Sequence, residues 1–148
     1  MKPKKILWVD DSFANKLHDL MAYEDELTYS GGYDDVKIAH PDEAVDFLEK
    51  KDEDFACIIL DMMMPFGKRF SRGETEDGTK TGIILANKIQ KMDKYEAVPI
   101  VLLTSVRHIC ESHDKKKFLC LFKADIAPFR FLREIQNEIK KHVGGNRE

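Results

Sequence analysis

Five short, largely apolar runs recur along this chain of 148 residues, and patterns typical of helices separate them. Each run is too short to be a stable helix by itself and suits a strand that is covered on both faces. The runs span residues 6–9, 36–39, 55–60, 98–103 and 118–122. Because strands and helices alternate in this order, the sequence predicts an α/β fold: one open parallel sheet with helices on both of its faces.

Apolar residues at helical spacing predict the intervening helices. Phe13, Leu17, Leu20 and Met21 indicate a first helix, with Ser12 as its N-cap. We expect further helices over residues 44–51, 83–92, 106–114 and 129–143. The closing pair Gly144-Gly145 would end the last of them.

Composition narrows the class of protein. Hydrophobic residues make up 43% of the chain and charged residues 34%, which is typical of one globular domain with one core. The net charge of −3 disfavours a nucleic-acid-binding surface. No apolar stretch approaches the ~20 residues that cross a membrane, and the N-terminus lacks a secretory signal. We therefore expect a cytoplasmic protein whose cysteines, Cys57, Cys110 and Cys120, are reduced thiols.

Polar residues follow four of the five predicted strands. They are the pair Asp10-Asp11, then Asp61, Thr104 and Lys123. In an open parallel sheet these positions share one edge, where such folds bind ligands. Up to three carboxylates at one edge repel one another, so the site should bind a cation. Oxygen ligands of this kind favour Mg²⁺.

The same residues could carry phosphoryl chemistry. A carboxylate can attack phosphorus and form an aspartyl phosphate, while Lys123 supplies positive charge and Thr104 a hydroxyl donor. Each residue also has a local alternative: the acidic pair as a helix cap, Asp61 as a loop residue, Thr104 as a cap and Lys123 as a solvated side chain. The local alternatives are less favoured when the four positions are taken together, because all four fall at the ends of predicted strands.

These motifs, in this order, resemble the receiver domain of two-component response regulators. The resemblance rests on Ile6-Leu-Trp-Val-Asp-Asp-Ser12, Leu60-Asp-Met-Met-Met-Pro65, Pro99-Ile-Val-Leu-Leu-Thr-Ser105 and Lys123, and it covers about residues 4–143. It implies a flavodoxin-like, doubly wound, five-stranded parallel sheet in the order 2-1-3-4-5. It also implies a single receiver domain over residues 1–148, because the segment after Lys123 is too short for an output domain.

By this resemblance Asp61 is the phosphoacceptor. Asp10 and Asp11 match the acidic pair that binds Mg²⁺ together with Asp61, and the backbone carbonyl of Met63 matches the position that completes the metal shell. Thr104 matches the hydroxyl that moves toward the phosphoryl group, and Lys123 the lysine that contacts it. The resemblance assigns Mg²⁺ as the cofactor.

The implied function is signalling. A histidine kinase or phosphotransfer protein would donate a phosphoryl group to Asp61, and a separate downstream effector or relay protein would receive the signal. Such a switch promotes only its own phosphorylation and dephosphorylation and is not an enzyme. We expect a monomer or weak dimer, with neither nucleic acid nor membrane as a partner.

Three features depart from the family pattern. Ala124 replaces the proline that usually follows the lysine, and Cys120 replaces a common aromatic residue. Residues 65–82 form an unusually long polar connection, in which Phe66 and Phe70 could be anchors. A connection of this length is usually functional or disordered, so it is either a partner-binding or lid element beside Asp61 or a solvated, mobile insertion.

Two other functions remain open. One is a receiver-like interaction module that never uses phosphate, which the changes at Cys120 and Ala124 would suit. The other is a haloacid-dehalogenase-like phosphatase, which the sequence Asp10-Asp11-Ser12 disfavours because that family carries D-x-D after its first strand. His108, Cys110 and His113 lack the spacing of a zinc site, so we assign them no metal.

Overall fold

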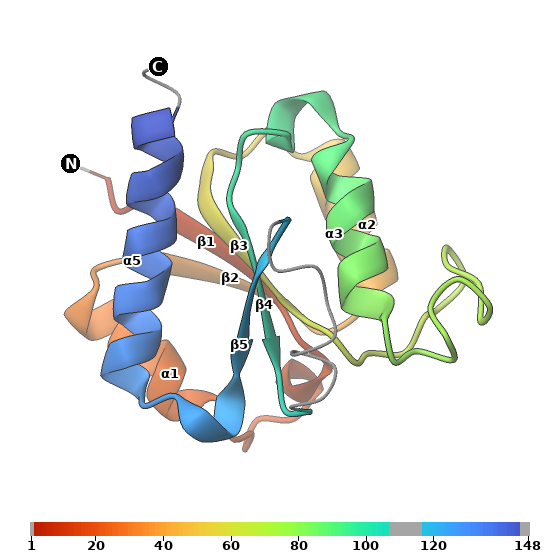
Figure 1. The fold of residues 1–148 in the computed structure, drawn as a ribbon, viewed down its shortest axis with the longest axis horizontal. Helices are drawn as coiled ribbons and strands as arrows, with labels where there is room; N and C mark the ends of the chain where they lie inside the picture. Colours follow the sequence, from red (N-terminus) through yellow and green to blue (C-terminus); the bar gives the residue numbers. More distant parts are fainter. Residues whose placement is uncertain (1, 107–116, 146–148) are drawn as a thin grey trace.

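The computed structural model of the chain describes residues 2–106 and 117–145. Five strands form one parallel sheet in the order β2-β1-β3-β4-β5 (Figure 1). The strands are β1 (Lys5–Val9), β2 (Asp34–Ile38), β3 (Phe55–Asp61), β4 (Ile100–Thr104) and β5 (Leu119–Phe122). This confirms the predicted doubly wound fold and its strand order.

Helices cover both faces of the sheet, and each face has its own apolar core. One core lies under α2 (Pro41–Lys50) and α3 (Thr81–Gln90). The other lies under α1 (Met21–Asp25), a π-helical turn (Glu26–Ser30) and α5 (Pro128–Gly145). Trp8 is fully buried in this second core, where its ring packs 5.3 Å from Phe13 and 5.4 Å from Phe131. Strand β1 is therefore an inner strand of the sheet, and its last residues lie at the carboxyl edge.

The first helix begins later than the sequence predicts. The carboxylate of Asp10 accepts a hydrogen bond from the backbone N–H of Ser12 and starts a 3₁₀ turn over Asp11–Ala14. Extended backbone at Asn15 ends that turn, and the helix proper starts only at Met21. Ser12 is therefore not the N-cap, and Leu17 is 89% exposed instead of facing the core. The prediction of a helix from Ser12 was wrong because a side-chain cap closed a short turn first.

The other described helices follow the prediction closely. Pro41 occupies the first turn of α2, where its missing N–H is harmless, and His40 caps that helix by accepting from the N–H of Asp42. The predicted helix over residues 106–114 lies almost entirely outside the described residues, as do His108, Cys110 and His113. Cys57 is buried, and neither it nor the half-buried Cys120 forms a disulfide. Within residues 2–106 and 117–145, no helix combines the length and apolar character that crossing a membrane requires.

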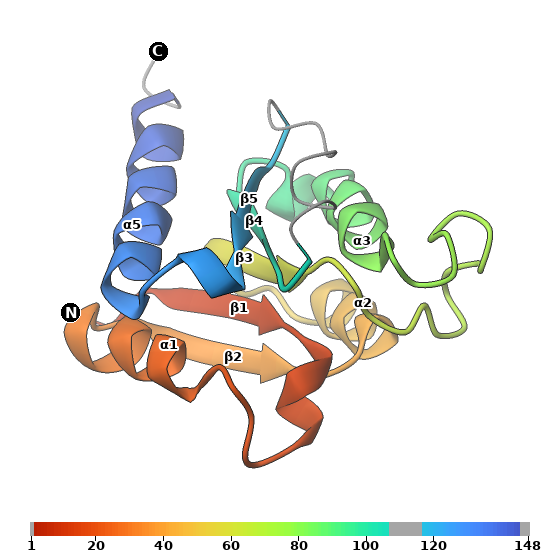
Figure 2. The ribbon, with the colours of Figure 1, turned by 60° about the horizontal axis from the view of Figure 1, so that its bottom comes forward.

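Residues 66–80, which we call the insertion, form a folded lobe that projects from the sheet edge beside α3 (Figures 1 and 2). The carboxylate of Asp42 on α2 accepts from the backbone N–H groups of Lys68 (2.8 Å) and Arg69 (3.1 Å). The Arg69 side chain also pairs with Asp46 on the same helix. Phe70 is buried in the α2–α3 core and Phe66 packs against that core, so both are anchors.

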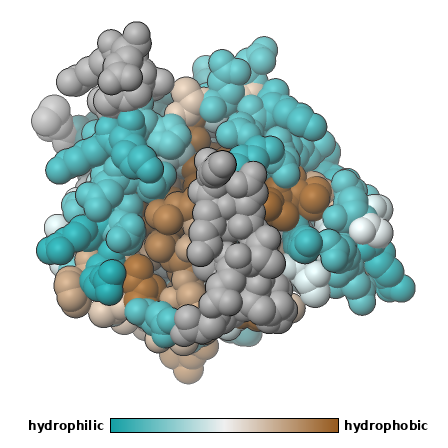
Figure 3. Space-filling view, in the orientation of Figure 1, coloured by the Kyte–Doolittle hydropathy of each residue, from teal (hydrophilic) through white to brown (hydrophobic). Residues whose placement is uncertain are grey.

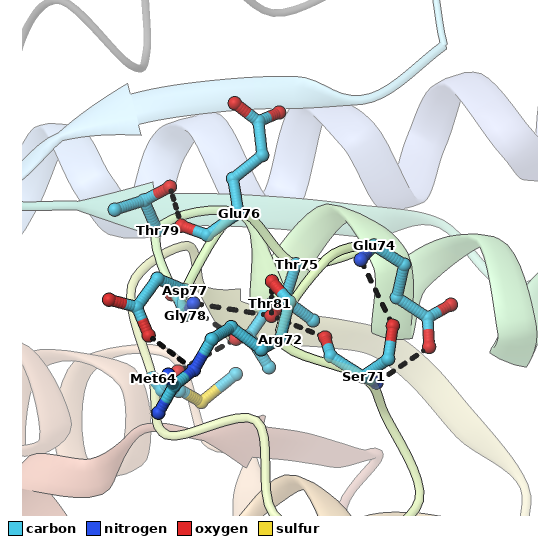
Figure 4. A network of polar contacts seen from close by, with 10 residues as sticks. All are labelled: Met64, Ser71, Arg72, Glu74, Thr75, Glu76, Asp77, Gly78, Thr79 and Thr81. Atoms are coloured by element: carbon cyan, nitrogen blue, oxygen red, sulfur yellow. Dashed lines mark hydrogen bonds and ion pairs between the residues drawn. The ribbon is translucent and has the colours of Figure 1, made fainter.

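The lobe is also braced from within (Figure 4). The buried hydroxyl of Thr75 donates to the carbonyl of Ser71 and accepts from the N–H of Gly78. Arg72 pairs with Asp77, and Lys80 with Glu76. Its surface is mostly hydrophilic, like that of α5, while hydrophobic residues gather beside the edge strand β5 (Figure 3).

Candidate functional site

Three carboxylates meet at the carboxyl edge of the two central strands. Asp10 follows β1 directly and Asp61 ends β3, and these strands are neighbours whose register pairs Val9 with Leu60. Asp10, Asp11 and Asp61 each offer one oxygen, and these atoms all lie within 4.8 Å of one another. Asp10 is completely buried and Asp61 almost so, while Asp11 is exposed. The predicted convergence of these three side chains is confirmed.

Lys123 joins this cluster from the edge strand. Its Nζ atom lies 3.0 Å from Oδ2 of Asp10 and 4.0 Å from Oδ1 of Asp61. Its side chain is only 11% exposed. The alternative of a solvated lysine is therefore wrong, and the contact joins residues that are 113 positions apart in the sequence.

The carboxylates outnumber the cation in this cluster. Burial raises the pKa of Asp61 to about 8; the negative charges of Asp10 and Asp11 act in the same direction, and Lys123 opposes them. Burial alone would lower the pKa of Lys123, but Asp61 and Asp10 raise it above its usual value, so this group is an ammonium. Excess negative charge in a largely buried cluster favours a bound cation. A set of three carboxylate oxygens fits Mg²⁺.

Thr104 ends β4 at the same edge and is fully buried. In the register of β3 and β4, Asp61 lies beside Leu103, so Thr104 is one position further along. Its Oγ1 atom accepts from the backbone N–H of Val106 at 3.1 Å. This is the local contact that a cap would make, but the helix predicted after Thr104 lies almost entirely outside the described residues. The cap role and the contact with a phosphoryl group both stay predictions.

The loop after Asp61 is fixed by the start of α3. The N–H of Gly82 donates to the carbonyl of Met62 (2.8 Å), and the hydroxyl of Thr81 donates to that of Met64 (2.7 Å). Met62 and Met64 are buried in the core, which leaves Met63 between them 37% exposed. The role of the Met63 carbonyl as a metal ligand stays a prediction, but the loop that carries it is held on both sides.

Gly82 is a functional position that the sequence analysis missed. A Cβ atom at Gly82 would lie 2.1 Å from the backbone carbonyl oxygen of Asp61 and 2.7 Å from Cα of Met62. Only glycine allows α3 to approach the loop this closely. The available signal was the glycine just before the apolar pattern of the third helix.

Tyr23 is a second residue that the sequence analysis missed. Its hydroxyl, on α1, donates to the backbone carbonyls of Lys123 and Ile126 in the turn that follows β5. No sequence pattern indicates this contact, because it joins residues 100 and 103 positions apart.

No protein-family model and no curated protein matches this sequence. Its structure, however, is similar to many solved structures. The response regulator receiver domain protein of Methanospirillum hungatei JF-1 superposes with a TM-score of 0.68 at 18% identity, covering 97% of this chain and 98% of that one. The chemotaxis response regulator CheY4 of Vibrio cholerae gives 0.66 at 23% identity, covering 92% and 98%.

A third similar structure is that of the response regulator TrrA of Thermotoga maritima, solved in complex with Mg²⁺-BeF. It superposes with a TM-score of 0.56 at 23% identity, covering 94% of this chain and 98% of that one. These similarities extend over nearly the whole length of both partners and agree with the strand order 2-1-3-4-5. The protein therefore has the CheY-like fold of response regulator receiver domains.

Proposed function

We propose that this protein is a phosphoacceptor signalling domain that receives a phosphoryl group on Asp61. The observation that carries this proposal is the position of one nearly buried carboxylate, Asp61, between an acidic pair and a buried ammonium at the carboxyl edge of the sheet. Neither an isolated helix cap nor a loop aspartate would require Lys123 and three carboxylates in one cluster.

Mg²⁺ is the cofactor that the donor set fits. The carboxylates of Asp10, Asp11 and Asp61 would hold it, with the Met63 carbonyl as a further oxygen ligand. When bound, it would neutralise the carboxylates and the incoming phosphoryl oxygens. The Mg²⁺-BeF complex of the Thermotoga maritima response regulator supports this assignment.

The donor would be a phosphohistidine on a histidine kinase or phosphotransfer protein. A carboxylate oxygen of Asp61 attacks the phosphorus and forms an O–P bond while the N–P bond breaks. The imidazole nitrogen leaves with the bonding electrons and takes up a proton from solvent. Asp61 must be ionised for this attack, and the positive charge of Lys123 favours the ionised form by lowering the pKa of Asp61.

Lys123 and Thr104 would stabilise the transferred group. The Nζ atom of Lys123 already lies 4.0 Å from Asp61 and carries its charge at neutral pH, so it can pair with a phosphoryl oxygen on that residue. The hydroxyl of Thr104 accepts its bond from Val106, which leaves its hydrogen available to donate to the phosphoryl group.

The output would pass to a separate downstream effector or relay protein. The insertion departs from the family pattern. Its attachments to Asp42 on α2 and, through Gly78, to Met64 in the loop after Asp61 suit a partner-binding element. Replacing residues 66–80 by a short glycine linker and measuring transfer from the partner kinase tests this role. An unchanged transfer rate would count against it.

Acetyl phosphate tests the phosphoacceptor assignment without a known kinase. The protein is incubated with Mg²⁺ and acetyl phosphate and its intact mass is measured, with Asp61→Asn as the test variant and Asp77→Asn, an exposed site on the insertion, as control. We expect one Mg²⁺-dependent phosphoryl adduct in the wild type and the control and none in Asp61→Asn.

The same experiment separates the rival functions. An adduct that survives Asp61→Asn would contradict the assignment. Absence of an adduct in every variant would favour the phosphate-independent interaction module, and steady hydrolysis of small phosphate esters would favour a phosphatase.

A further inference from the structure

Tyr23 connects the first helix to the segment that carries Lys123. Its Oη atom lies 2.9 Å from the carbonyl oxygen of Lys123 and 2.7 Å from that of Ile126. Helix α1 and the connection from β5 to α5 lie side by side in both ribbon views (Figures 1 and 2). One phenol therefore spans both ends of the turn that follows β5.

The ring of Tyr23 is itself held in place. It packs edge-on against Phe131 of α5, with ring centroids 5.3 Å apart and an angle of 86° between the planes. Burial raises the pKa of Tyr23 above its usual value, so the phenol keeps its proton and remains a donor at neutral pH. Both neighbours are carbonyl oxygens, which only accept, so the single hydroxyl hydrogen serves the two of them.

The turn from Lys123 to Ile126 is short. It is a single 3₁₀ turn over Lys123–Asp125, flanked by extended backbone at Phe122 and Ile126. The residue after Lys123 is Ala124, joined by a trans peptide bond, and alanine leaves the φ angle free where proline would restrict it. The hydrogen bonds from Tyr23 therefore add a constraint from outside the turn on the backbone of Lys123.

That backbone position decides where the ammonium lies. The carbonyl that Tyr23 binds and the Nζ atom that reaches Asp10 (3.0 Å) and Asp61 (4.0 Å) belong to the same residue. We propose that Tyr23 is a positioning residue, which through its hydroxyl holds the turn after β5 so that Lys123 reaches the carboxylate cluster. The expected effect on the phosphorylation rate rests on the proposed function of Asp61, whereas the expected effect on the position of Lys123 does not.

Tyr23→Phe is the test variant, because it removes the hydroxyl and keeps the ring contact with Phe131. The matched control is Tyr29→Phe, in the π-helical turn that follows α1, where the side chain is 84% exposed. In metal-free and phosphate-free protein, the acetylation rate of each lysine is measured by peptide mass spectrometry, with exposed Lys88 as internal reference. We expect Lys123 to react several-fold faster in Tyr23→Phe and unchanged in Tyr29→Phe.

The second measurement is the rate of Asp61 phosphorylation by acetyl phosphate and Mg²⁺. We expect Tyr23→Phe to slow it by about three- to tenfold, the effect of one lost hydrogen bond. In a Lys123→Met background the same substitution should change the rate no further, because its effect passes through Lys123. If Tyr23 only supported general stability, its substitution would still slow the reaction in the Lys123→Met background. It would also raise the reactivity of other ion-paired lysines, such as Lys5, whose ammonium donates to Glu53.

The two measurements keep this inference separate from the proposed function. Unchanged acetylation of Lys123 in Tyr23→Phe, or an equal rise at Lys5, would overturn the positioning role. If the wild type itself is never phosphorylated, the proposed function fails, and the acetylation of Lys123 alone decides whether Tyr23 positions it.

Discussion

The ammonium group of Lys123 donates to Oδ2 of Asp10 over 3.0 Å. Its distance to Oδ1 of Asp61 is longer, at 4.0 Å. The ammonium group is thus held mainly by Asp10, and its longer distance to Asp61 is an ion-pair contact without a hydrogen bond. This contact indicates how the carboxylate cluster is stabilised in the structure.

Lys123→Met should lower the free energy of unfolding of the metal-free protein by about 3 kcal/mol at pH 8. The substitution removes the cation from a buried pair and leaves its carboxylate partners uncompensated. Urea denaturation in the presence of a chelator measures the loss, and added Mg²⁺ should reduce it. Lys88→Met, on the exposed side of α3, is the control. Equal losses in the two variants would contradict a structural role for Lys123.

Asp61→Asn should stabilise the metal-free protein, and the gain should grow between pH 5 and pH 8. The pKa of Asp61 rises from 3.8 to about 8 on folding, so the folded state binds more protons than the unfolded state in this range. The free energy of unfolding of the wild type therefore falls as the pH rises, and the neutral amide avoids this loss. We expect a gain of roughly 2–4 kcal/mol at pH 8. A gain that is independent of pH would show that charge is not its cause.

Gly82→Ala should destabilise the fold by more than about 3 kcal/mol and abolish phosphorylation by acetyl phosphate. The new Cβ would meet the backbone of Asp61 and Met62, which cannot move without displacing the loop after Asp61. Gly73→Ala is the matched control, since a Cβ there meets nothing within 4 Å. Thermal unfolding and intact mass measure the two effects. Wild-type phosphorylation of Gly82→Ala would contradict the tight packing of α3 on this loop.

Asp42→Asn should cost roughly 1–2 kcal/mol at pH 7 and nothing near pH 2. Burial alone would raise the pKa of Asp42, but the N–H groups of Lys68 and Arg69 bind its carboxylate and bring the pKa below its usual value. A lowered pKa stabilises the fold above the unfolded value, and the contribution disappears as the pH falls through the folded value. Asp46→Asn, which touches only the Arg69 side chain, should cost less than about 1 kcal/mol.

The sheet and most of the site could be predicted from the sequence because local signals specify them. Apolar runs marked all five strands, and the polar residues just after them marked Asp10, Asp11, Asp61, Thr104 and Lys123. Parallel strands bring such residues to one edge whatever the details of the connections. The geometry of the three carboxylates and Lys123 thus followed from the strand order alone.

Other features could not be predicted because they depend on contacts between distant residues, or on which of two local structures forms at the same residues. The spacing of Phe13, Leu17 and Leu20 suggested a helix, but the Asp10 carboxylate closed a short turn first. The contact of Tyr23 with the turn after β5 has no local pattern. Similarly, Asp42 lies before the predicted helix over residues 44–51, and no local pattern indicates that its carboxylate fixes the insertion.

The position of the phosphoryl group tests the central claim most directly. After reaction with acetyl phosphate and Mg²⁺, the protein is reduced with borohydride, which converts an aspartyl phosphate to homoserine, and is then digested and mapped by mass spectrometry. The account predicts that homoserine replaces aspartate at position 61 alone and that omission of Mg²⁺ prevents this. Modification at Asp10 or Asp11 with Asp61 intact, or no conversion at any aspartate, would contradict it.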